Sequence, residues 1–376
     1  MKQNWELKKF SEICGFVRGP FGGSLKKNIF KEDGYAVYEQ QHAIYNQFKD
    51  IRYFVDETKY NEMKRFELFP GDLIMSCSGT MGKVAIVPNE IKKGIINQAL
   101  LKLTPSKKVD AIFLKLWMQS ESFQESLSKY SQGAAIQNIA SVAILKNIEI
   151  PLPPLQEQQR IVAILDEAFR AIDKAKANTE QNLKNASELF ESELQRVFSE
   201  KGDGWEEKTL GEVIEIRNGK NQSSVISKSG KYKIMGSAGN VMGFATDYIC
   251  EEGTTIIGRK GNISKPLYIE EKFWNVDTAF GLYPKNNLNK KLVYYICLTI
   301  DFAGMNRGTT IPSLVKSELL KLNIFIPTEK DQQKIVSKLD ALREQTKKLE
   351  AVYEKKLQDL EELKKSVLSK AFSGEL

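Results

Sequence analysis

Five short segments of the chain place a basic side chain beside a glycine in a predicted loop. They are Arg18-Gly19, Gly82-Lys83, Arg217-Asn218-Gly219-Lys220-Asn221-Gln222, Arg259-Lys260-Gly261-Asn262 and Asn306-Arg307-Gly308-Thr309. Glycine lets the backbone approach phosphates closely, arginine can donate two hydrogen bonds to a guanine edge, and asparagine or glutamine can pair with adenine. Glycine beside lysine or asparagine is also ordinary turn chemistry. Recurrence of such loops in both halves of the chain favours nucleic-acid recognition.

The catalytic motifs that this sequence approaches are all incomplete. The segment Gly79-Thr80-Met81-Gly82-Lys83 approaches a phosphate-binding loop, but Cys77 stands where the leading glycine belongs and Val84 where a hydroxyl must hold magnesium. An adenine methyltransferase would carry an Asp/Asn-Pro-Pro-aromatic tetrapeptide, and Pro153-Pro154 is flanked by leucines. Arrays such as Asp72 with Glu90 and Lys92, or Asp247 with Glu270 and Lys272, resemble nuclease sites but are not equivalent in the two halves. The pattern predicts a recognition protein without catalytic residues.

Metal, disulfide and membrane signals are also weak. The four cysteines, Cys14, Cys77, Cys250 and Cys297, are scattered, form no Cys-x-x-Cys pair and have only His42 to join them. We therefore expect four reduced thiols, no metal and no cofactor. No stretch approaches the roughly 18 apolar residues of a membrane span, and the N-terminus lacks a signal-peptide pattern, so a cytoplasmic protein is expected.

The sequence is an internal duplication. Trp5-Glu6-Leu7-Lys8-Lys9-Phe10-Ser11-Glu12-Ile13 aligns with Trp205-Glu206-Glu207-Lys208-Thr209-Leu210-Gly211-Glu212-Val213, and Gly19 then falls on Gly219. Further matches are Gly71-Asp72-Leu73-Ile74-Met75 with Gly253-Thr254-Thr255-Ile256-Ile257, 79–83 with 261–265, Ile150-Pro151 with Ile326-Pro327, and Gln158-Gln159-Arg160-Ile161-Val162 with Gln332-Gln333-Lys334-Ile335-Val336. A period this long predicts two copies of a domain with an appendage.

Each copy begins with a globular part. Strands are expected at 35–38, 72–75, 83–87, 255–257 and 266–269, and helices at 109–127 and about 290–302. A proline boundary then follows, at Pro151-Leu152-Pro153-Pro154 in the first copy and at Pro327 in the second.

Beyond each proline boundary the sequence predicts a long helix. Residues 156–200 and 331–373 contain no proline and carry apolar residues in a 4,3 rhythm. The second rhythm uses Ile335, Leu339, Leu342, Leu349, Tyr353, Leu360, Leu363 and Val367, broken by Thr346, Lys356 and Lys370. The first uses Ile161, Leu165, Ala168, Ile172 and Ala175, then slips by one residue to Leu183, Ala186, Phe190, Leu194 and Val197. Pro154 suits the first turn of one helix, and Thr328 with Asp331 resembles a capping box for the other. We expect an antiparallel pair about 60 Å long, with a globular domain at each end.

The positive charge lies outside these helices. Residues 156–199 and 330–376 carry 17 basic and 17 acidic residues. Residues 1–155 carry 21 basic against 16 acidic, and residues 200–329 carry 17 against 15. The whole surplus of +7 therefore belongs to the globular parts, where it favours a polyanionic partner.

Taken together, these motifs resemble the specificity subunits of type I restriction-modification systems. The strongest match is the junction 150–162, repeated at 326–336, in which a proline boundary precedes a Gln-rich helix start. The Trp-x-x-x-x-Leu/Phe-x-Glu-Ile/Val openings, the Gly-Asp-Leu-Ile strand with its Ser78-Gly79-Thr80-x-Gly82 turn, and the loop Gly308-Thr309-Thr310-Ile311-Pro312 are also similar. The second junction departs from the pattern, with Thr328-Glu329-Lys330 where the first has Leu-Pro-Pro.

The resemblance implies an α+β chain with a pseudo-two-fold repeat. Target recognition domains would span 1–155 and 201–329, and spacer helices 156–200 and 330–376. Each domain would read half of a split double-stranded DNA sequence, and the helix pair would set their separation. Modification subunits, two per chain, would dock on the pair, with restriction subunits bound indirectly.

The candidate DNA contacts combine the basic-glycine loops with neighbouring polar residues. They are Arg18, Lys26, Lys27, Gln41, His42, Ser78, Thr80, Lys83, Gln132, Arg217, Lys220, Asn221, Arg259, Lys260, Asn262, Lys265, Asn306, Arg307 and Thr309.

Two alternatives remain open from the sequence. One is a structural coiled-coil protein with non-specific basic heads, which would lose DNA at salt concentrations that a specific complex survives. The other is a metal-dependent nuclease, which would cleave DNA as the purified chain alone.

Overall fold

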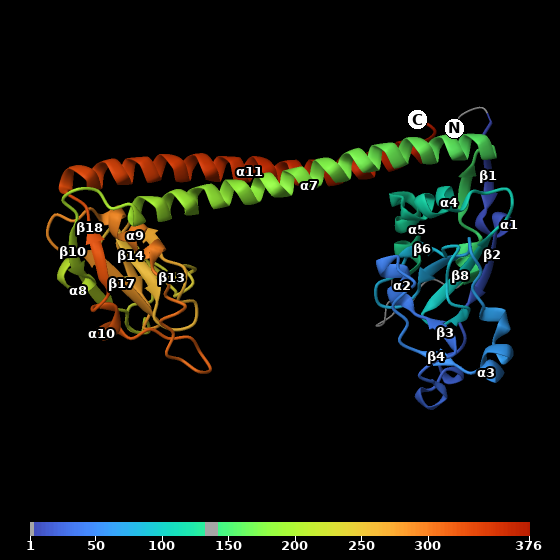
Figure 1. Ribbon diagram of the computed structural model, residues 1–376, viewed down its shortest axis with the longest axis horizontal. Coiled ribbons are helices and arrows are strands. Elements are labelled where there is room, and N and C mark those ends of the chain that lie inside the picture. The colour runs from blue at the N-terminus through green and yellow to red at the C-terminus, as the bar shows by residue number, and fades with distance from the viewer. Residues whose placement is uncertain (1–3, 132–141) are drawn as a thin grey trace. The chain divides into compact units, whose positions relative to one another are not determined.

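The computed structural model describes residues 4–131 and 142–376 (Figure 1). The chain divides into two compact units, one comprising Met1–Thr179 with Lys356–Leu376 and the other Glu180–Lys355. Each unit contains a globular fold and a part of both long helices.

In the described part of the first unit, nine strands form three small sheets. Their orders are β2-β8-β5-β6, β4-β3-β7 and β1-β9. The strands are β1 Glu6–Lys9, β2 Cys14–Arg18, β3 Tyr35–Tyr38, β4 Phe54–Val55, β5 Leu73–Ser76, β6 Val84–Ile86, β7 Gly94–Ile96, β8 Leu100–Pro105 and β9 Glu149–Leu152. The short helices are α1 Phe10–Ile13, α2 Gln40–Tyr45, α3 Glu57–Glu62, α4 Ala111–Gln119, α5 Glu121–Ser131 and α6 Val142–Lys146.

The second unit repeats this plan strand for strand. Its sheets have the orders β11-β17-β14-β15, β13-β12-β16 and β10-β18. The strands are β10 Glu206–Thr209, β11 Ile214–Asn218, β12 Tyr232–Met235, β13 Val241–Ala245, β14 Thr254–Gly258, β15 Leu267–Ile269, β16 Phe273–Asn275, β17 Ala279–Pro284 and β18 Asn323–Ile326. The short helices are α8 Leu210–Val213, α9 Lys290–Thr299 and α10 Lys316–Leu319. The internal duplication is confirmed.

One predicted helix divides into two. Residues 109–127 were expected to be continuous, but α4 ends at Gln119 and α5 begins at Glu121. Ser120 between them has an extended backbone, and its hydroxyl donates to the carbonyl of Trp117 at 2.6 Å. The bend lets Trp117 and Phe123 pack on Phe10 in the core.

The two long helices are α7, Leu155–Ser199, and α11, Glu329–Ser373. Each has 45 residues and is therefore ~67 Å long. They run antiparallel in both units. In the first, Asp173 pairs with Lys364 at 2.8 Å, and in the second Glu193 pairs with Lys338 at 2.6 Å.

The predicted helix seam is right in outline and wrong at several positions. Thr346, expected to interrupt the seam, is 3% exposed, whereas Leu349 and Leu363 are 41% and 47% exposed. The 4,3 pattern considers only the partner helix, yet near their ends both helices also pack on a globular fold. Phe113 of α4, for example, lies edge-on to Phe372 of α11 at 5.1 Å.

Both long helices begin with the same buried amide. The Gln158 side chain donates to the carbonyl oxygens of Lys108 and Pro153 and accepts from the Asp110 backbone N–H at 2.8 Å. In the second unit, Gln332 donates to Pro327 and accepts from Asn289 at 2.9 Å. Asp110 and Asn289 are the N-caps of α4 and α9. The repeated glutamine thus fixes each spacer helix to the globular fold.

Candidate nucleic-acid interface

In the second unit, the predicted loops meet at one end of the four-stranded sheet. β11 and β14 run antiparallel to β17, so Asn218 and Gly258 at their ends lie beside the start of β17. Backbone hydrogen bonds join the loops that leave this end: Gly219 N–H donates to Ala279, and Arg259 N–H donates to Thr278 at 2.8 Å. We call this region the loop end of the second unit.

Two of the predicted segments pair directly at this loop end. Gly261 N–H donates to the Pro312 carbonyl, and Leu314 N–H donates to the Arg259 carbonyl, both at 2.9 Å. Lys260 and Ser313 form an antiparallel bridge between the same segments. The loops 259–262 and 306–313, separate in sequence, therefore form one ribbon carrying Arg259, Lys260 and Arg307.

The three arginines of this loop end are accessible but have local partners. Arg217 pairs with Glu215 at 3.1 Å, and Arg307 with Glu318 at 3.1 Å. Arg259 donates to the Asp277 carbonyl at 3.3 Å, and its guanidinium lies over the Phe280 ring. Such exposed ion pairs contribute little to stability, so a DNA phosphate or base can replace the carboxylate at small cost.

The other predicted residues of the second unit divide into two groups. Lys220, Lys260, Lys265 and Thr309 are exposed, and Asn262 is partly buried. Asn306 instead shapes its loop, because its side-chain oxygen accepts from the backbone of Gly308 and Ser313 and its amide donates to Gly308. Asn221 likewise accepts from the Ser223 backbone at 2.8 Å. In both asparagines the side-chain oxygen already accepts a hydrogen bond from the backbone of its own loop.

The first unit has an equivalent loop end. β2 and β5 end at Arg18 and Ser76, beside the start of β8. Gly19 N–H donates to Leu100, and Cys77 N–H donates to Ala99, both at 2.9 Å. The two aligned glycines confirm the equivalence. A Cβ on Gly19 would lie 1.8 Å from the Asn97 carbonyl oxygen, and one on Gly219 would lie 1.8 Å from that of Val276.

At this loop end, Arg18 contacts the buried Cys77 and Ser78 contacts Gln40. Arg18 is partly buried, and its guanidinium faces Cys77, where burial raises the pKa of the thiol to about 12 against the opposing effect of the arginine. The Ser78 hydroxyl lies 3.5 Å from the Gln40 side-chain oxygen. Gln40 follows β3, at a position that the sequence gave no reason to select. Thr80 and Lys83 are exposed on the adjoining turn.

His42 does not belong to the interface. Its side chain is 0% exposed, and its two ring nitrogens lie 3.0 Å from the carbonyl oxygens of Glu39 and Asp50. It therefore closes the loop after α2, and the prediction of a DNA contact there is wrong. Gln41 is partly buried, with its amide 3.3 Å from the Asp50 carbonyl. Lys26 and Lys27 are exposed, whereas Gln132 lies outside the described residues.

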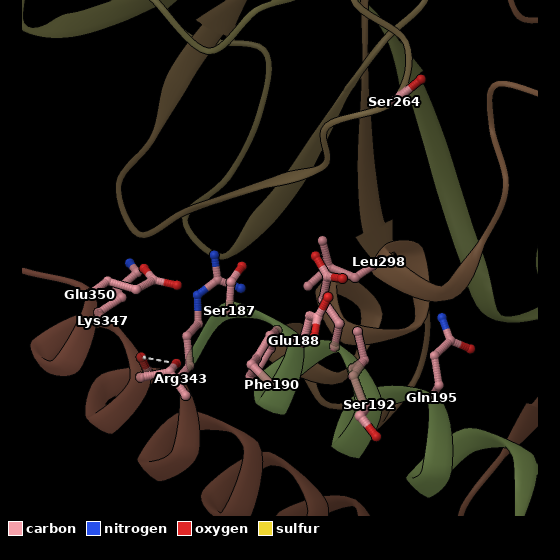
Figure 2. A pocket seen from close by; sticks show the side chains of 13 residues that line it. Ser187, Glu188, Phe190, Ser192, Gln195, Ser264, Leu298, Arg343, Lys347 and Glu350 are labelled. Carbon is pink, nitrogen blue, oxygen red and sulfur yellow. Dashed lines mark hydrogen bonds between the residues drawn. The ribbon is translucent and has the colours of Figure 1, made fainter. Parts of the chain in front are cut away.

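A cavity of about 660 Å³ adjoins the helix pair in the second unit. Figure 2 shows its lining from α7 and α11, together with Leu298 of α9 and Ser264 in the turn that follows β14. Across the seam, the Arg343 guanidinium lies 5.3 Å from the centre of the Phe190 ring.

The first unit contains the corresponding cavity, of about 590 Å³. There the Lys364 ammonium lies 5.0 Å from the Phe169 ring. By the repeat offset of 174 residues, Phe169 corresponds to Arg343 and Phe190 to Lys364, so a ring in one unit stands at the position of a cation in the other. In both units the ring belongs to α7 and the cation to α11. The duplication therefore extends to the helix pair, with the same cation–ring contact in each unit.

Comparison with known proteins agrees with this duplicated design. The family model described as type I restriction modification DNA specificity domain matches twice, at residues 2–185 and 202–361. The chain belongs to this family. Its role as a DNA-recognition chain without a catalytic function of its own, expected from the sequence, follows from that membership.

Curated relatives resemble this specificity chain over all or about half of its length. The MjaIX specificity subunit of Methanocaldococcus jannaschii is 25% identical over 415 residues, covering 100% of this chain and 94% of the relative. The EcoKI specificity subunit of Escherichia coli is 26% identical over 187 residues, covering 48% of this chain and 39% of the relative.

Two solved structures share the fold. A chain from a study of assembly and conformational transition in a type I system has a TM-score of 0.83 at 19% identity, covering 100% of this chain and 99% of that one. The HsdS subunit of Thermoanaerobacter tengcongensis has a TM-score of 0.68 at 18% identity, covering 100% and 98%.

The structure also describes the cysteines, the potential metal ligands and the hydropathy of the helices. All four cysteines are buried and unpaired. Among the described residues, no cluster of three or more histidine, cysteine or acidic side chains is placed to hold a metal ion. Within the same part of the chain, no helix has the length and apolar character needed to cross a membrane.

Proposed function

We propose that this specificity chain binds a bipartite double-stranded DNA sequence through the loop ends of its two units. Residues 1–155 would read one half-site and residues 201–329 the other. The observation that carries the proposal is the equivalence of the two loop ends. Each presents basic side chains on loops that leave equivalent ends of two strands and are fixed by backbone hydrogen bonds at the start of the strand between them. Helical DNA repeats every ~34 Å, so helices of ~67 Å suit readers one or two turns apart.

Modification subunits are the proposed protein partners, with two bound per chain. Support comes from the repeat in the helix pair. Leu189 of α7 and Leu363 of α11 correspond at the offset of 174 and are 51% and 47% exposed. Two equivalent apolar positions on a spacer of zero net charge suit two copies of one partner. Restriction subunits would join through these subunits, and the complex would act in the cytoplasm.

The proposal is tested by replacing the arginines of one loop end. Arg259→Ala and Arg307→Ala should each relax or weaken recognition of the second half-site about 10-fold while the first half-site is unchanged. Selection of duplexes from a randomised pool by the full chain, with and without each substitution, measures this. Lys285→Ala, at the opposite end of β17, is the matched control and should leave both half-sites intact.

A different result would overturn the assignment of these residues. Uniform loss of affinity across all sequences would mean phosphate contacts. Failure of the unaltered chain and its assembled complex to select any sequence would favour the alternative of non-specific basic heads. Methylome sequencing of a host with and without this chain would then show no bipartite motif.

A further inference from the structure

The loop after β2 exposes a large aromatic side chain at the loop end of the first unit. Of the large apolar side chains in the described residues, Phe21 is the most exposed, at 92%. Water-exposed aromatic surface of this size is unfavourable unless something covers it. Phe21 lies three residues after Arg18, where β2 ends, and so belongs to the surface proposed to face DNA.

The structure holds this ring outward. On one side, Gly19 N–H donates to the Leu100 carbonyl at 2.9 Å and Pro20 is buried. On the other, Ser24 N–H donates to the Phe21 carbonyl at 2.8 Å in a 3-10 turn, and Leu25 is 7% exposed in a core cluster. Because both flanks are anchored, the outward position of Phe21 is a property of the folded loop.

The positive charge around Phe21 indicates which class of partner would cover it. Residues 14–31 include Arg18, Lys26, Lys27 and Lys31 and no acidic residue, a local charge of +4. Among the described residues, Lys26 and Lys27 are exposed without an ion-pair partner. A projecting ring with two free lysines five and six residues further along the chain fits a polyanion with stackable bases, because the lysines can bind phosphates while the ring meets bases.

We propose that Phe21 stacks against a base step in or beside the first half-site and partly unstacks it. The inference rests on the proposed function, because it requires the first unit to hold DNA at its loop end. It adds an aromatic contact to the polar readers, and it makes the deformability of that step part of the specificity.

The test uses the full chain assembled with its modification subunits and a duplex that the unaltered chain selects. A fluorescent adenine analogue, which brightens when unstacked, is placed in turn at each position of the first half-site and its flanks. The unaltered chain should brighten it at one step. Phe21→Ala should remove that signal and weaken binding about 10-fold, whereas Phe21→Trp should keep both. Circular dichroism should show unchanged folding, because the side chain packs on little.

Phe69→Ala is the matched control. Phe69 is 54% exposed in the turn before β5, at the opposite end of the same sheet, and its removal should change neither signal. Equal affinity and equal brightening for Phe21→Ala would overturn the inference and leave the proposed function standing. Normal DNA binding with loss of modification subunits would also overturn it, by showing a protein contact. Absence of sequence-selective binding by the unaltered chain would overturn both proposals.

Discussion

Single residues show why two dissimilar halves keep one geometry. Gly19 and Gly219 occupy equivalent positions in the two loop ends, where the backbone passes a carbonyl too closely for any side chain. Glycine is needed there for space, since neither residue has a positive φ. The loops on either side can then vary in sequence while their starting point stays fixed.

Substitution of these glycines should therefore destabilise the unit. We expect Gly19→Ala to cost about 3 kcal/mol and to lower the thermal midpoint by several degrees, because the new Cβ meets the Asn97 carbonyl. Gly23→Ala, in the same loop but facing open space, should change stability by less than about 0.5 kcal/mol. Equal thermal midpoints for Gly19→Ala and Gly23→Ala would show that the backbone moves to accept the new Cβ at little cost in stability.

The candidate residues show what spacing can and cannot predict. The sequence predicted that basic side chains beside glycine lie in loops, because glycine marks where strands end in tight turns. In the structure these loops lie at or beside the loop ends. His42 was wrongly included, since its burial depends on the fold of residues 39–50 rather than on neighbours in sequence. Phe21 was missed, although a basic segment free of acidic residues surrounds it in the sequence.

Among the elements, the long helices were the most predictable. Their bounds followed from proline boundaries and periodicity, and antiparallel packing followed from the repeat. Their inward faces were predicted less well. Thr179 fills a slot where the first helix slips by one residue, and it is buried with its hydroxyl donating to the Ala175 carbonyl at 2.7 Å. A hydroxyl satisfied by its own helix can be buried, and apolar periodicity does not detect it.

The buried glutamines at the two helix starts have a measurable role. Gln158→Ala should destabilise the first unit by about 1–3 kcal/mol, because the Asp110 N–H and two carbonyl groups lose their partner. Gln332→Ala should act in the same way on the second unit. Gln159→Ala, at the exposed neighbouring position, serves as the control. Urea unfolding that fails to separate Gln158→Ala from Gln159→Ala would contradict this role.

At the scale of the whole molecule, the net charge differs between the globular parts and the spacer helices. The +7 surplus lies in the globular parts, five in the first and two in the second, and the spacer helices carry none. Under the proposed function, attraction to DNA is thereby concentrated where sequence is read, and the helix pair, with zero net charge, is left for contacts with protein. The duplication explains why both properties appear twice.

The helix pair also offers a direct test of how target spacing is set. Deleting seven residues from α7 and seven paired residues from α11, near Thr179 and Lys356, shortens each helix by about 10 Å and keeps the seam in phase. The gap between half-sites should shrink by about three base pairs, because B-DNA rises ~3.4 Å per base pair. The half-sites themselves should be unchanged, since both loop ends are intact. An equal-length variant with alanine at the exposed positions of the same segments controls for altered helix surface. Site selection that returned the original gap from the shortened chain would show that DNA spacing is set by something other than helix length.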